Sequence, residues 1–341
     1  MVRAWAARKP WAGRGGPEPG RGPVAGGAGR AGGDGEALFT EAFLAQLRGL
    51  SVQSRSTLSA GLVGEHRSRR RGSSPEFADF KRYSPGDDFR RIDWNTYARL
   101  DTLFVRMSEV TTELDIHLLI DASASMDWRG GASGPTKLAY ARRLAGTIGY
   151  VALWHFDRVA LTPFGADTAA PFGPAQGRNQ AVPLLRFAGA IRASGTTDVA
   201  RVLSEYGHRR RRPGILILIS DLLSGDPEDL VTALRWYRAH GWHTSVLQVL
   251  DPAELDPAAM LAPSAGGRPV AAELVDVEDG GRLRVVPGEA VLADYRASMG
   301  AWLEGLEAVC RGEHVEYIRL QTDWPLETLV AKLLRERGIL G

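Results

Sequence analysis

The pattern of apolar and polar residues changes near position 115, where short apolar runs begin to alternate with longer amphipathic segments. The runs that have the length and composition of β-strands are 115–120, 157–164, 215–220, 243–250 and 315–320. The segments with helical apolar spacing or helix boundary signals are 136–156, 179–191, 197–207, 226–241, 288–311 and 325–338. This alternation predicts an α/β fold with a doubly wound, mostly parallel sheet.

Two further features complete this α/β region. The run "ILILIS" at 215–220 is apolar at nearly every position, which is typical of a strand buried on both faces of a parallel sheet. Residues 272–286 read "AELVDVEDGGRLRVV" and predict a β-hairpin that turns at 279–281. We therefore expect a core over 112–250, and a C-terminal part over 251–341 that completes the fold with a hairpin, a strand and helices.

The part of the chain that precedes this region differs from it in composition and in residue pattern. Residues 1–36 are rich in Gly, Pro, Ala and Arg, a composition that predicts a disordered tail. Residues 37–111 form a charged subdomain in our interpretation, with a helix over 36–50 and a half-buried strand over 103–110. Its opposite charges, turn residues and aromatics indicate ion pairs that fix an irregular segment. The alternatives are a docking face or an arginine-bearing ligand site, with Arg67, Arg82 and Arg90 as candidate anion contacts.

Composition and charge narrow the class of protein. Hydrophobic residues make up 44% and charged residues 24% of the chain, as in soluble globular proteins, and no run of about 18 apolar residues predicts a membrane span. The net charge of +2 and two short basic runs without interleaved aromatics do not indicate nucleic-acid binding. The single cysteine, Cys310, excludes an internal disulfide and fits a reducing compartment. We expect a soluble, cytoplasmic protein.

Oxygen-bearing side chains gather where the predicted strands end. The first core strand runs into Asp121, followed by Ser123 and Ser125, and "ILILIS" runs into Asp221. Thr196 lies between them in "SGTTD", just before a short helix. Because ligands of open parallel sheets bind beyond the carboxyl ends of the strands, we expect these side chains to converge there.

This set of donors predicts a particular kind of site. Residues i, i+2 and i+4 of an extended segment point to one side, so Asp121, Ser123 and Ser125 can face a common point. Carboxylate and hydroxyl oxygens suit Mg²⁺, or alternatively Mn²⁺ or Ca²⁺. Two carboxylates neutralise a dication while hydroxyls add no charge, so the ion could still accept an acidic side chain from a partner protein. The alternative is structural, in which the serines cap the next helix.

The combination of "DASAS", Thr196 and Asp221 resembles the metal-ion-dependent adhesion site of von Willebrand factor A domains, over about residues 115–250. The resemblance implies that Asp121, Ser123, Ser125, Thr196 and Asp221 bind a divalent cation, with Asp221 acting through water. It also implies a von Willebrand A-like fold for this part of the chain.

Residues 64–99, "GEHRSRRRGSSPEFADFKRYSPGDDFRRIDWNTYAR", resemble the signature of the bacterial domain of unknown function 58 family, as does the ending from 322 onward. Together the resemblance covers roughly residues 40–341. It implies a partner, a MoxR-type AAA+ ATPase, and a role in the assembly or maturation of other protein complexes. Many members carry membrane helices ahead of this region, whereas this chain resembles a short soluble form without membrane association.

Catalysis is the less favoured hypothesis. None of the seven histidines accompanies a recognisable nucleophile motif, and the sequence contains no GxSxG, HExxH or GxxxxGKS pattern. His117 lies in a predicted strand and is expected to be a packed core residue. A metal-assisted phosphoester hydrolase remains an alternative, as does a scaffold whose aspartates are structural. No small-molecule substrate is expected.

Overall fold

The computed structural model describes residues 77–85, 92–108, 113–130, 134–165, 170–210, 212–223, 227–259, 272–275, 281–286 and 288–326, with positions 39, 44, 45, 47, 87 and 89. Contacts divide the chain into a main unit, residues 1–58 and 114–341, and a small unit, residues 59–113. The tail expected over 1–36 lies outside the described residues, as does nearly all of the helix expected over 325–338.

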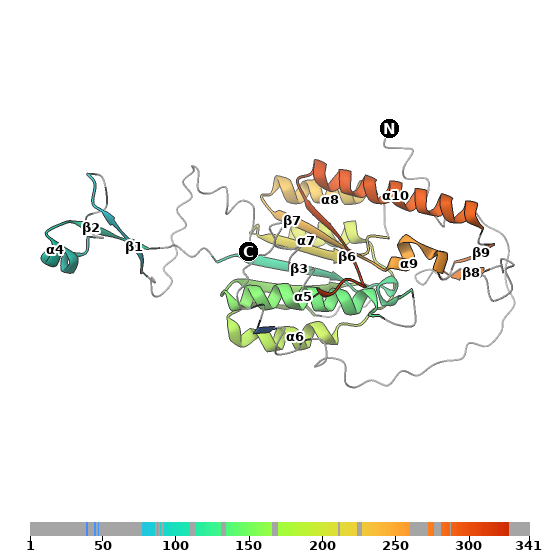
Figure 1. Cartoon of the computed structure of the whole chain (residues 1–341), viewed down its shortest axis with the longest axis horizontal. Coiled ribbons are helices and arrows are strands. Elements are labelled where there is room, and N and C mark those ends of the chain that lie inside the picture. Colours follow the sequence, from blue (N-terminus) through green and yellow to red (C-terminus); the bar gives the residue numbers. More distant parts are fainter. Residues whose placement is uncertain are drawn as a thin grey trace. The chain divides into compact units, whose positions relative to one another are not determined.

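The main unit is built on one six-stranded sheet, shown in Figure 1. In spatial order its strands are β10 (Glu316–Gln321), β7 (His243–Leu250), β6 (Ile215–Ser220), β3 (Asp115–Asp121), β4 (Arg158–Phe164) and β5 (Phe172–Gln176). Five strands are parallel, and β5 pairs antiparallel with β4. The predicted α/β fold with a mostly parallel sheet is therefore confirmed. The edge strand β5 was not predicted, because "FGPAQ" carries a glycine and a proline in a five-residue strand.

Helices cover both faces of this sheet (Figure 1). One face packs against α5 (Lys137–Trp154) and α6 (Ala181–Ala190). The other packs against α7 (Val199–Arg209), α8 (Pro227–Ala239) and α10 (Glu289–Gly312). Side chains of β6 alternate between the two cores: Ile215, Ile217 and Ile219 face the first, while Leu216 and Leu218 face the second. All six residues of β6 are buried, as predicted for a central strand.

Shorter elements lie between these strands and helices. They are the 3₁₀-helices η3 (Ala124–Asp127), η4 (Arg178–Gln180) and η5 (Pro257–Ala259), the one-turn helix α9 (Pro252–Leu255), and the strands β8 (Ala272–Val275) and β9 (Arg282–Val285). β8 and β9 pair antiparallel, with Val275 opposite Arg282, which confirms the hairpin predicted over 272–286.

The small unit contains an antiparallel strand pair, β1 (Phe77–Arg82) and β2 (Phe104–Ser108), with the helix α4 (Trp94–Leu100) between them in sequence. Asp93 caps α4 by accepting hydrogen bonds from the backbone N–H groups of Asn95 and Thr96. β2 was predicted, whereas β1 and α4 were not. The side chains of Trp94 and Leu100 are more than half exposed, and the docking-face hypothesis for this segment stays a prediction.

Three residues that the sequence analysis placed in the subdomain over 37–111 pack with the main unit. Leu47 is buried in the main core, and Phe39 and Leu44 pack against the same cluster.

His117 of β3 is a buried core residue, as the sequence predicted. Its Nδ1 atom lies 2.8 Å from the hydroxyl oxygen of Tyr206 on α7, and the Trp242 ring meets it edge-on. Burial, reinforced by the nearby Arg210 guanidinium, lowers the pKa of His117 to about 4. The imidazole is therefore neutral in the folded protein at pH values where it is protonated in the unfolded chain.

This pKa shift predicts a loss of stability in mild acid. Because the folded pKa lies below the unfolded value of 6.5, the free energy of unfolding should fall as the pH drops from about 6.5 toward 4. Protonation of His117 should account for a decrease on the order of 3 kcal/mol in the free energy of unfolding over this pH range. Urea unfolding across this range should show a smaller pH dependence in His117→Asn than in the wild type. His155→Asn, at an exposed position, is the control, and equal pH dependence in all three proteins would contradict the assignment.

Candidate functional site

The candidate site lies at the carboxyl ends of β3 and β6, where the strand order reverses. From β3 the chain continues through α5 to β4 on one side, while β6 pairs with β3 on the other. Such a switch point is where open α/β sheets bind ligands. The register pairs Ile120 with Ile219, so Asp121 lies beside Ser220.

Asp121 is fully buried, and both of its carboxylate oxygens accept hydrogen bonds from neutral donors. The backbone N–H of Ser123 donates to Oδ1 at 2.9 Å, and the Ser220 hydroxyl donates to Oδ2 at 2.6 Å. Burial, and then the nearby Asp221 carboxylate, raise the pKa of Asp121 well above its ordinary value. A cation near this carboxylate would stabilise its charged form.

The hydroxyls of Ser123 and Ser125 face each other, with their Oγ atoms 3.0 Å apart. Ser123 is fully buried at the N-cap position of η3, and Ser125 is partly buried within it. Neighbouring ligands of an octahedral Mg²⁺ ion lie about 2.9 Å apart, given metal–oxygen distances of about 2.0–2.1 Å. The spacing of this hydroxyl pair therefore fits two adjacent ligands of such an ion. The Ser123 side chain makes no capping hydrogen bond to η3.

The loop containing Thr196 runs directly beside the loop containing the serines. The Ser194 N–H donates to the Ala122 carbonyl, and the Ala124 N–H donates to the Gly195 carbonyl, each at 2.8 Å. Two backbone hydrogen bonds thus hold together two loops that are about 70 residues apart in the sequence.

Of the two threonines in this loop, Thr196 is exposed, whereas the Thr197 hydroxyl oxygen is buried. Within the described part of the chain this oxygen has no hydrogen-bond partner. An unpaired buried hydroxyl is costly, so Thr197 is a second candidate for a cation ligand beside Thr196, which the sequence predicted. The sequence offered no signal to choose between adjacent threonines, because only their burial separates them.

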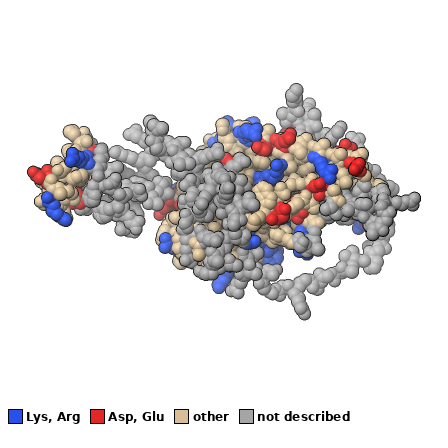
Figure 2. Space-filling model, in the orientation of Figure 1, with Lys and Arg blue, Asp and Glu red and all other residues tan. Residues whose placement is uncertain are grey.

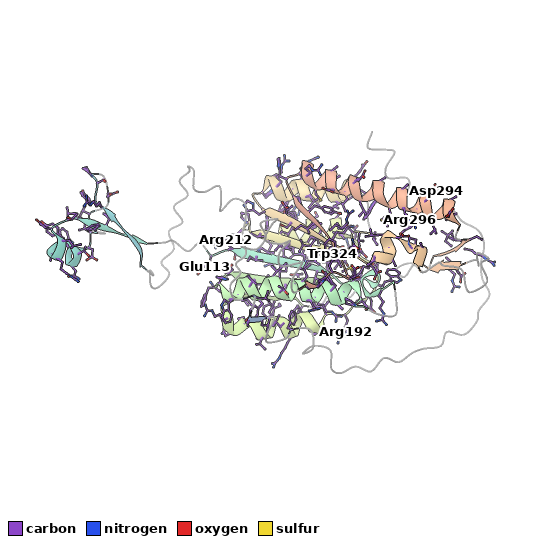
Figure 3. All side chains as sticks on the ribbon, in the orientation of Figure 1. Glu113, Arg192, Arg212, Asp294, Arg296 and Trp324 are labelled. Atoms are coloured by element: carbon purple, nitrogen blue, oxygen red, sulfur yellow. The ribbon has the colours of Figure 1, made fainter. Side chains whose placement is uncertain are left out.

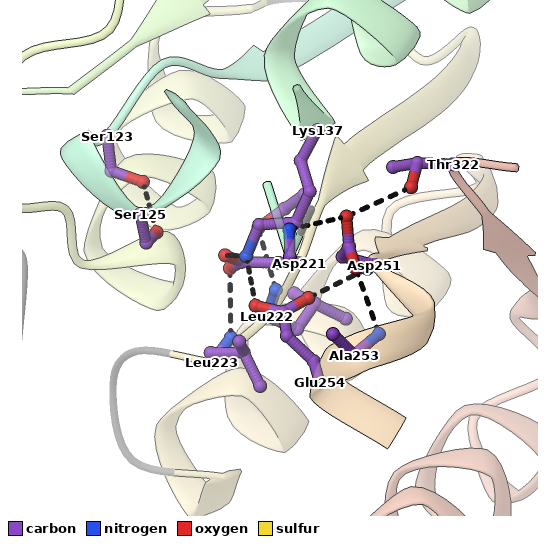
Figure 4. A network of polar contacts seen from close by, with 12 residues as sticks. Ser123, Ser125, Lys137, Asp221, Leu222, Leu223, Asp251, Ala253, Glu254 and Thr322 are labelled. Carbon is purple, nitrogen blue, oxygen red and sulfur yellow. Dashed lines mark hydrogen bonds and ion pairs between the residues drawn. The ribbon is translucent and has the colours of Figure 1, made fainter. Parts of the chain in front are cut away.

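Asp221 is engaged by a lysine, as Figure 4 shows. The Lys137 Nζ atom, from the first residue of α5, lies 2.7 Å from Asp221 Oδ2 and 2.5 Å from Glu254 Oε1 of α9. The Lys137 and Asp221 side chains are each 1% exposed. Burial alone would lower the pKa of Lys137, but the two carboxylates outweigh it and raise the pKa above its usual value. The ammonium is therefore charged.

Lys137 and Glu254 were missed in the sequence analysis. One signal was available for Lys137: it occupies the first turn of a helix, where a positive charge opposes the helix dipole and needs compensation. Glu254 is 117 residues away from Lys137, so no local pattern connects the two.

The carboxyl end of a third strand, β7, adds another acidic residue, Asp251, to this edge of the sheet, termed the rim. Asp251 follows β7 and caps α9, accepting a hydrogen bond from the Ala253 N–H, while the Glu254 carboxylate accepts one from the Asp251 N–H. This reciprocal arrangement is a capping box. The other oxygen of Asp251 accepts the Gly130 N–H at 3.0 Å, which ties the segment after η3 to α9.

The charges at this rim are unbalanced. Asp121, Asp221, Asp251 and Glu254 are all largely buried, and among the described residues Lys137 is in ion-pair contact with two of them, Asp221 and Glu254. In the described part of the chain, no group of three His, Cys, Asp or Glu side chains is arranged to hold a metal ion. A cation here would therefore need hydroxyl ligands, and the facing hydroxyls of Ser123 and Ser125 are candidates.

Other chemistry finds less support. The Cys310 thiol is fully buried, and burial raises its pKa to about 12, so it is neither ionised nor accessible. Acidic and basic side chains of the described residues are interspersed on the face shown in Figure 2, without a one-sign patch. Within the described ranges, no helix has the length and apolar character needed to cross a bilayer.

Comparison with known proteins gave matches at the levels of family, sequence and structure. The model of a family described as "Protein of unknown function DUF58" matches residues 79–299. The uncharacterized protein Rv1480 of Mycobacterium tuberculosis is 28% identical over 304 residues, covering 87% of this chain and 91% of that protein.

Solved structures also match, and two of them are as follows. The conserved hypothetical protein BatB from Bacteroides thetaiotaomicron has a TM-score of 0.38 and 15% identity, covering 66% of this chain and 98% of that one. The SpRpn10 VWA domain has a TM-score of 0.36 and 8% identity, covering 64% of this chain and 95% of that one.

The geometry at Asp121 predicts a stability role for Ser220. Ser220→Ala would remove the hydroxyl that donates to Asp121 and accepts from the Leu222 N–H. Leu222 has a left-handed φ of 56°. We expect a loss of about 2 kcal/mol in the free energy of unfolding, because two buried polar groups lose their partner. Urea unfolding measures it, with Ser204→Ala at an exposed position of α7 as the control. Equal stability of the two variants would show that these bonds contribute nothing.

Proposed function

The chain belongs to the DUF58 family of proteins of unknown function, and on this premise we propose that it is a protein-interaction module. It would hold a divalent cation at the carboxyl ends of β3 and β6. Through this cation it would bind an acidic side chain of a partner protein. One observation carries the proposal: the Ser123 and Ser125 hydroxyls lie 3.0 Å apart beside a buried carboxylate, Asp121, whose hydrogen-bond donors are all neutral.

The residues that would hold the cation divide into two groups. The hydroxyls of Ser123, Ser125 and one threonine of the 194–198 loop would be the direct ligands. The buried carboxylates Asp121 and Asp221 would supply the negative charge, directly or through water. A bound dication would offer an electrophilic position to an incoming carboxylate. Because hydroxyl ligands add no charge, such a site favours an acidic ligand from outside.

Lys137 supports this reading of the charge balance. The Lys137 ammonium already contacts Asp221. The carboxylates around a bound metal ion would therefore neutralise the metal ion less fully than their number suggests. An acidic side chain of a partner would then complete both the coordination and the charge. This argument favours a protein or peptide carboxylate over a phosphate-ester substrate, for which a general base beside the hydroxyl pair would also be needed.

The proposed partner is a MoxR-type AAA+ ATPase, and the proposed role is the assembly or maturation of other protein complexes. Both come from the family resemblance of residues 64–99. In this hypothesis the ATPase supplies the energy, and the cation site grips an acidic side chain of the ATPase or of its client. The role of the small unit in such a complex would be that of a second contact surface.

The hydroxyl pair predicts a direct effect on metal binding. Ser123→Ala combined with Ser125→Ala should weaken Mn²⁺ or Mg²⁺ binding at least roughly tenfold, since two ligands are lost. Isothermal titration calorimetry on the full chain measures it, and circular dichroism checks that the fold is retained. Affinity capture from native extract with Mg²⁺ should retrieve an AAA+ ATPase with the wild type, and not with the variant or with EDTA. Unchanged metal binding in a folded variant would refute the proposal.

The two threonines predict a contrast. Thr197→Val should weaken Mn²⁺ binding by roughly tenfold, because it removes the buried, unpaired hydroxyl and keeps the shape of the side chain. Thr196→Val changes an exposed hydroxyl of the same loop and should leave binding within about twofold of the wild type. The comparison is made by calorimetry at one pH. A loss confined to Thr196→Val would instead favour the ligand expected from the sequence.

A further inference from the structure

Lys137 pairs with Asp221, one of the carboxylates proposed to supply charge to a bound cation, and this pairing suggests a control on the site. Resting on the proposed function, we propose that Lys137 is a built-in competitor of the divalent cation, and that Glu254 sets the strength of this competition by drawing the ammonium away from Asp221. The affinity for metal would then depend on how the ammonium is shared between two carboxylates.

The first support is that the Lys137 ammonium is shielded from solvent. The side chain is 1% exposed, and its Nζ atom lies 5.9 Å from the centre of the Trp128 ring. Its position at the start of α5 opposes the helix dipole. A buried charge of this kind is tolerated only with close partners, so the ammonium stays with Asp221 and Glu254.

The second support is that Glu254 is held in place. Its second carboxylate oxygen accepts the Asp251 N–H at 2.8 Å, and its backbone carbonyl accepts the Tyr295 hydroxyl of α10 at 2.7 Å. Arg296, labelled in Figure 3, pairs with Asp256 at 2.8 Å and fastens the end of α9 to α10. Glu254 is thus a fixed second partner for the ammonium.

The third support is the shared carboxylate itself. Lys137 bonds Oδ2 of Asp221, while Oδ1 accepts the Leu223 N–H at 3.1 Å. A dication that uses Asp221 would therefore approach an oxygen beside the ammonium or share the same one. Two positive charges at one buried carboxylate repel each other with little screening, so each lowers the affinity of the site for the other.

Two variants should change metal affinity in opposite directions. Glu254→Gln leaves the ammonium with Asp221 alone and should weaken Mn²⁺ binding by roughly threefold or more. Lys137→Met combined with Glu254→Gln removes the ammonium while the net charge stays the same, and should strengthen Mn²⁺ binding by roughly tenfold or more. Dissociation constants come from calorimetry with Mn²⁺ alone on the full chain. Melting in EDTA checks the fold of each variant.

The matched controls use an exposed ion pair of α10, in which Arg311 and Glu307 are 2.9 Å apart. Glu307→Gln and Arg311→Met/Glu307→Gln repeat the same charge changes away from the site and should leave Mn²⁺ affinity unchanged. They separate competition at Asp221 from a general effect of charge on the protein.

The outcomes are distinct. Tighter Mn²⁺ binding by the Lys137→Met/Glu254→Gln variant supports the competition, including the case in which the wild type binds no measurable Mn²⁺. Equal or weaker binding by this variant, with a wild type that binds Mn²⁺, overturns the competition and leaves the proposed function standing. Absence of binding in both proteins overturns both. If the Lys137→Met/Glu254→Gln variant unfolds in EDTA, the Mn²⁺ affinity of Lys137→Arg is compared with that of the wild type instead. Arginine keeps the positive charge, so this variant should bind Mn²⁺ as weakly as the wild type. Stronger Mn²⁺ binding by Lys137→Arg would overturn the competition.

Discussion

The register between the parallel strands β3 and β6 is the constraint on which the site depends. It places Asp121 beside Ser220 at the rim of an otherwise apolar sheet, and the next residue, Asp221, is buried there as well. Buried carboxylates are costly unless they are hydrogen-bonded or paired with a cation. Neighbouring groups meet this requirement: the Ser123 N–H and the Ser220 hydroxyl donate hydrogen bonds to Asp121, and Lys137 at the start of α5 pairs with Asp221.

The two aspartates therefore have different electrostatic surroundings, although they end neighbouring strands. Asp121 is stabilised by neutral donors and, among the described residues, no cation contacts it, whereas Asp221 shares an ammonium with Glu254. A purely structural site would be expected to balance both carboxylates. The imbalance at Asp121, together with the facing serine hydroxyls, favours a cation on that side of the rim. Under the proposed function, the ammonium at Asp221 would leave such a cation with less negative charge around it, so an acidic ligand from a partner would add to the stability of the bound cation.

The fold was largely predictable because its elements are long and strongly periodic. The central strands and the helices α5, α7, α8 and α10 bury faces whose apolar spacing is visible in the sequence. The strand β5 and the elements β1 and α4 escaped prediction, because glycine, proline or dense charge masks their periodicity in five to seven residues. The strand-end aspartates and the serines at every second position were also visible. The burial of Thr197 rather than Thr196, and the pairing of Lys137 with Glu254, are tertiary facts that no local pattern carries.

Metal and partner at such a site cannot be treated as independent ligands. If an acidic side chain coordinates the cation, its binding raises the affinity for the cation, and the cation raises the affinity for the partner by the same factor, since linkage is reciprocal. A site built from hydroxyls, with an internal ammonium close by, starts from weak metal binding and so leaves a large part of the total free energy to the complex. A site of four unopposed carboxylates would instead hold its metal permanently and gain little from a partner. Under the proposed function, the arrangement around Lys137 would therefore favour assembly that requires both the cation and the partner.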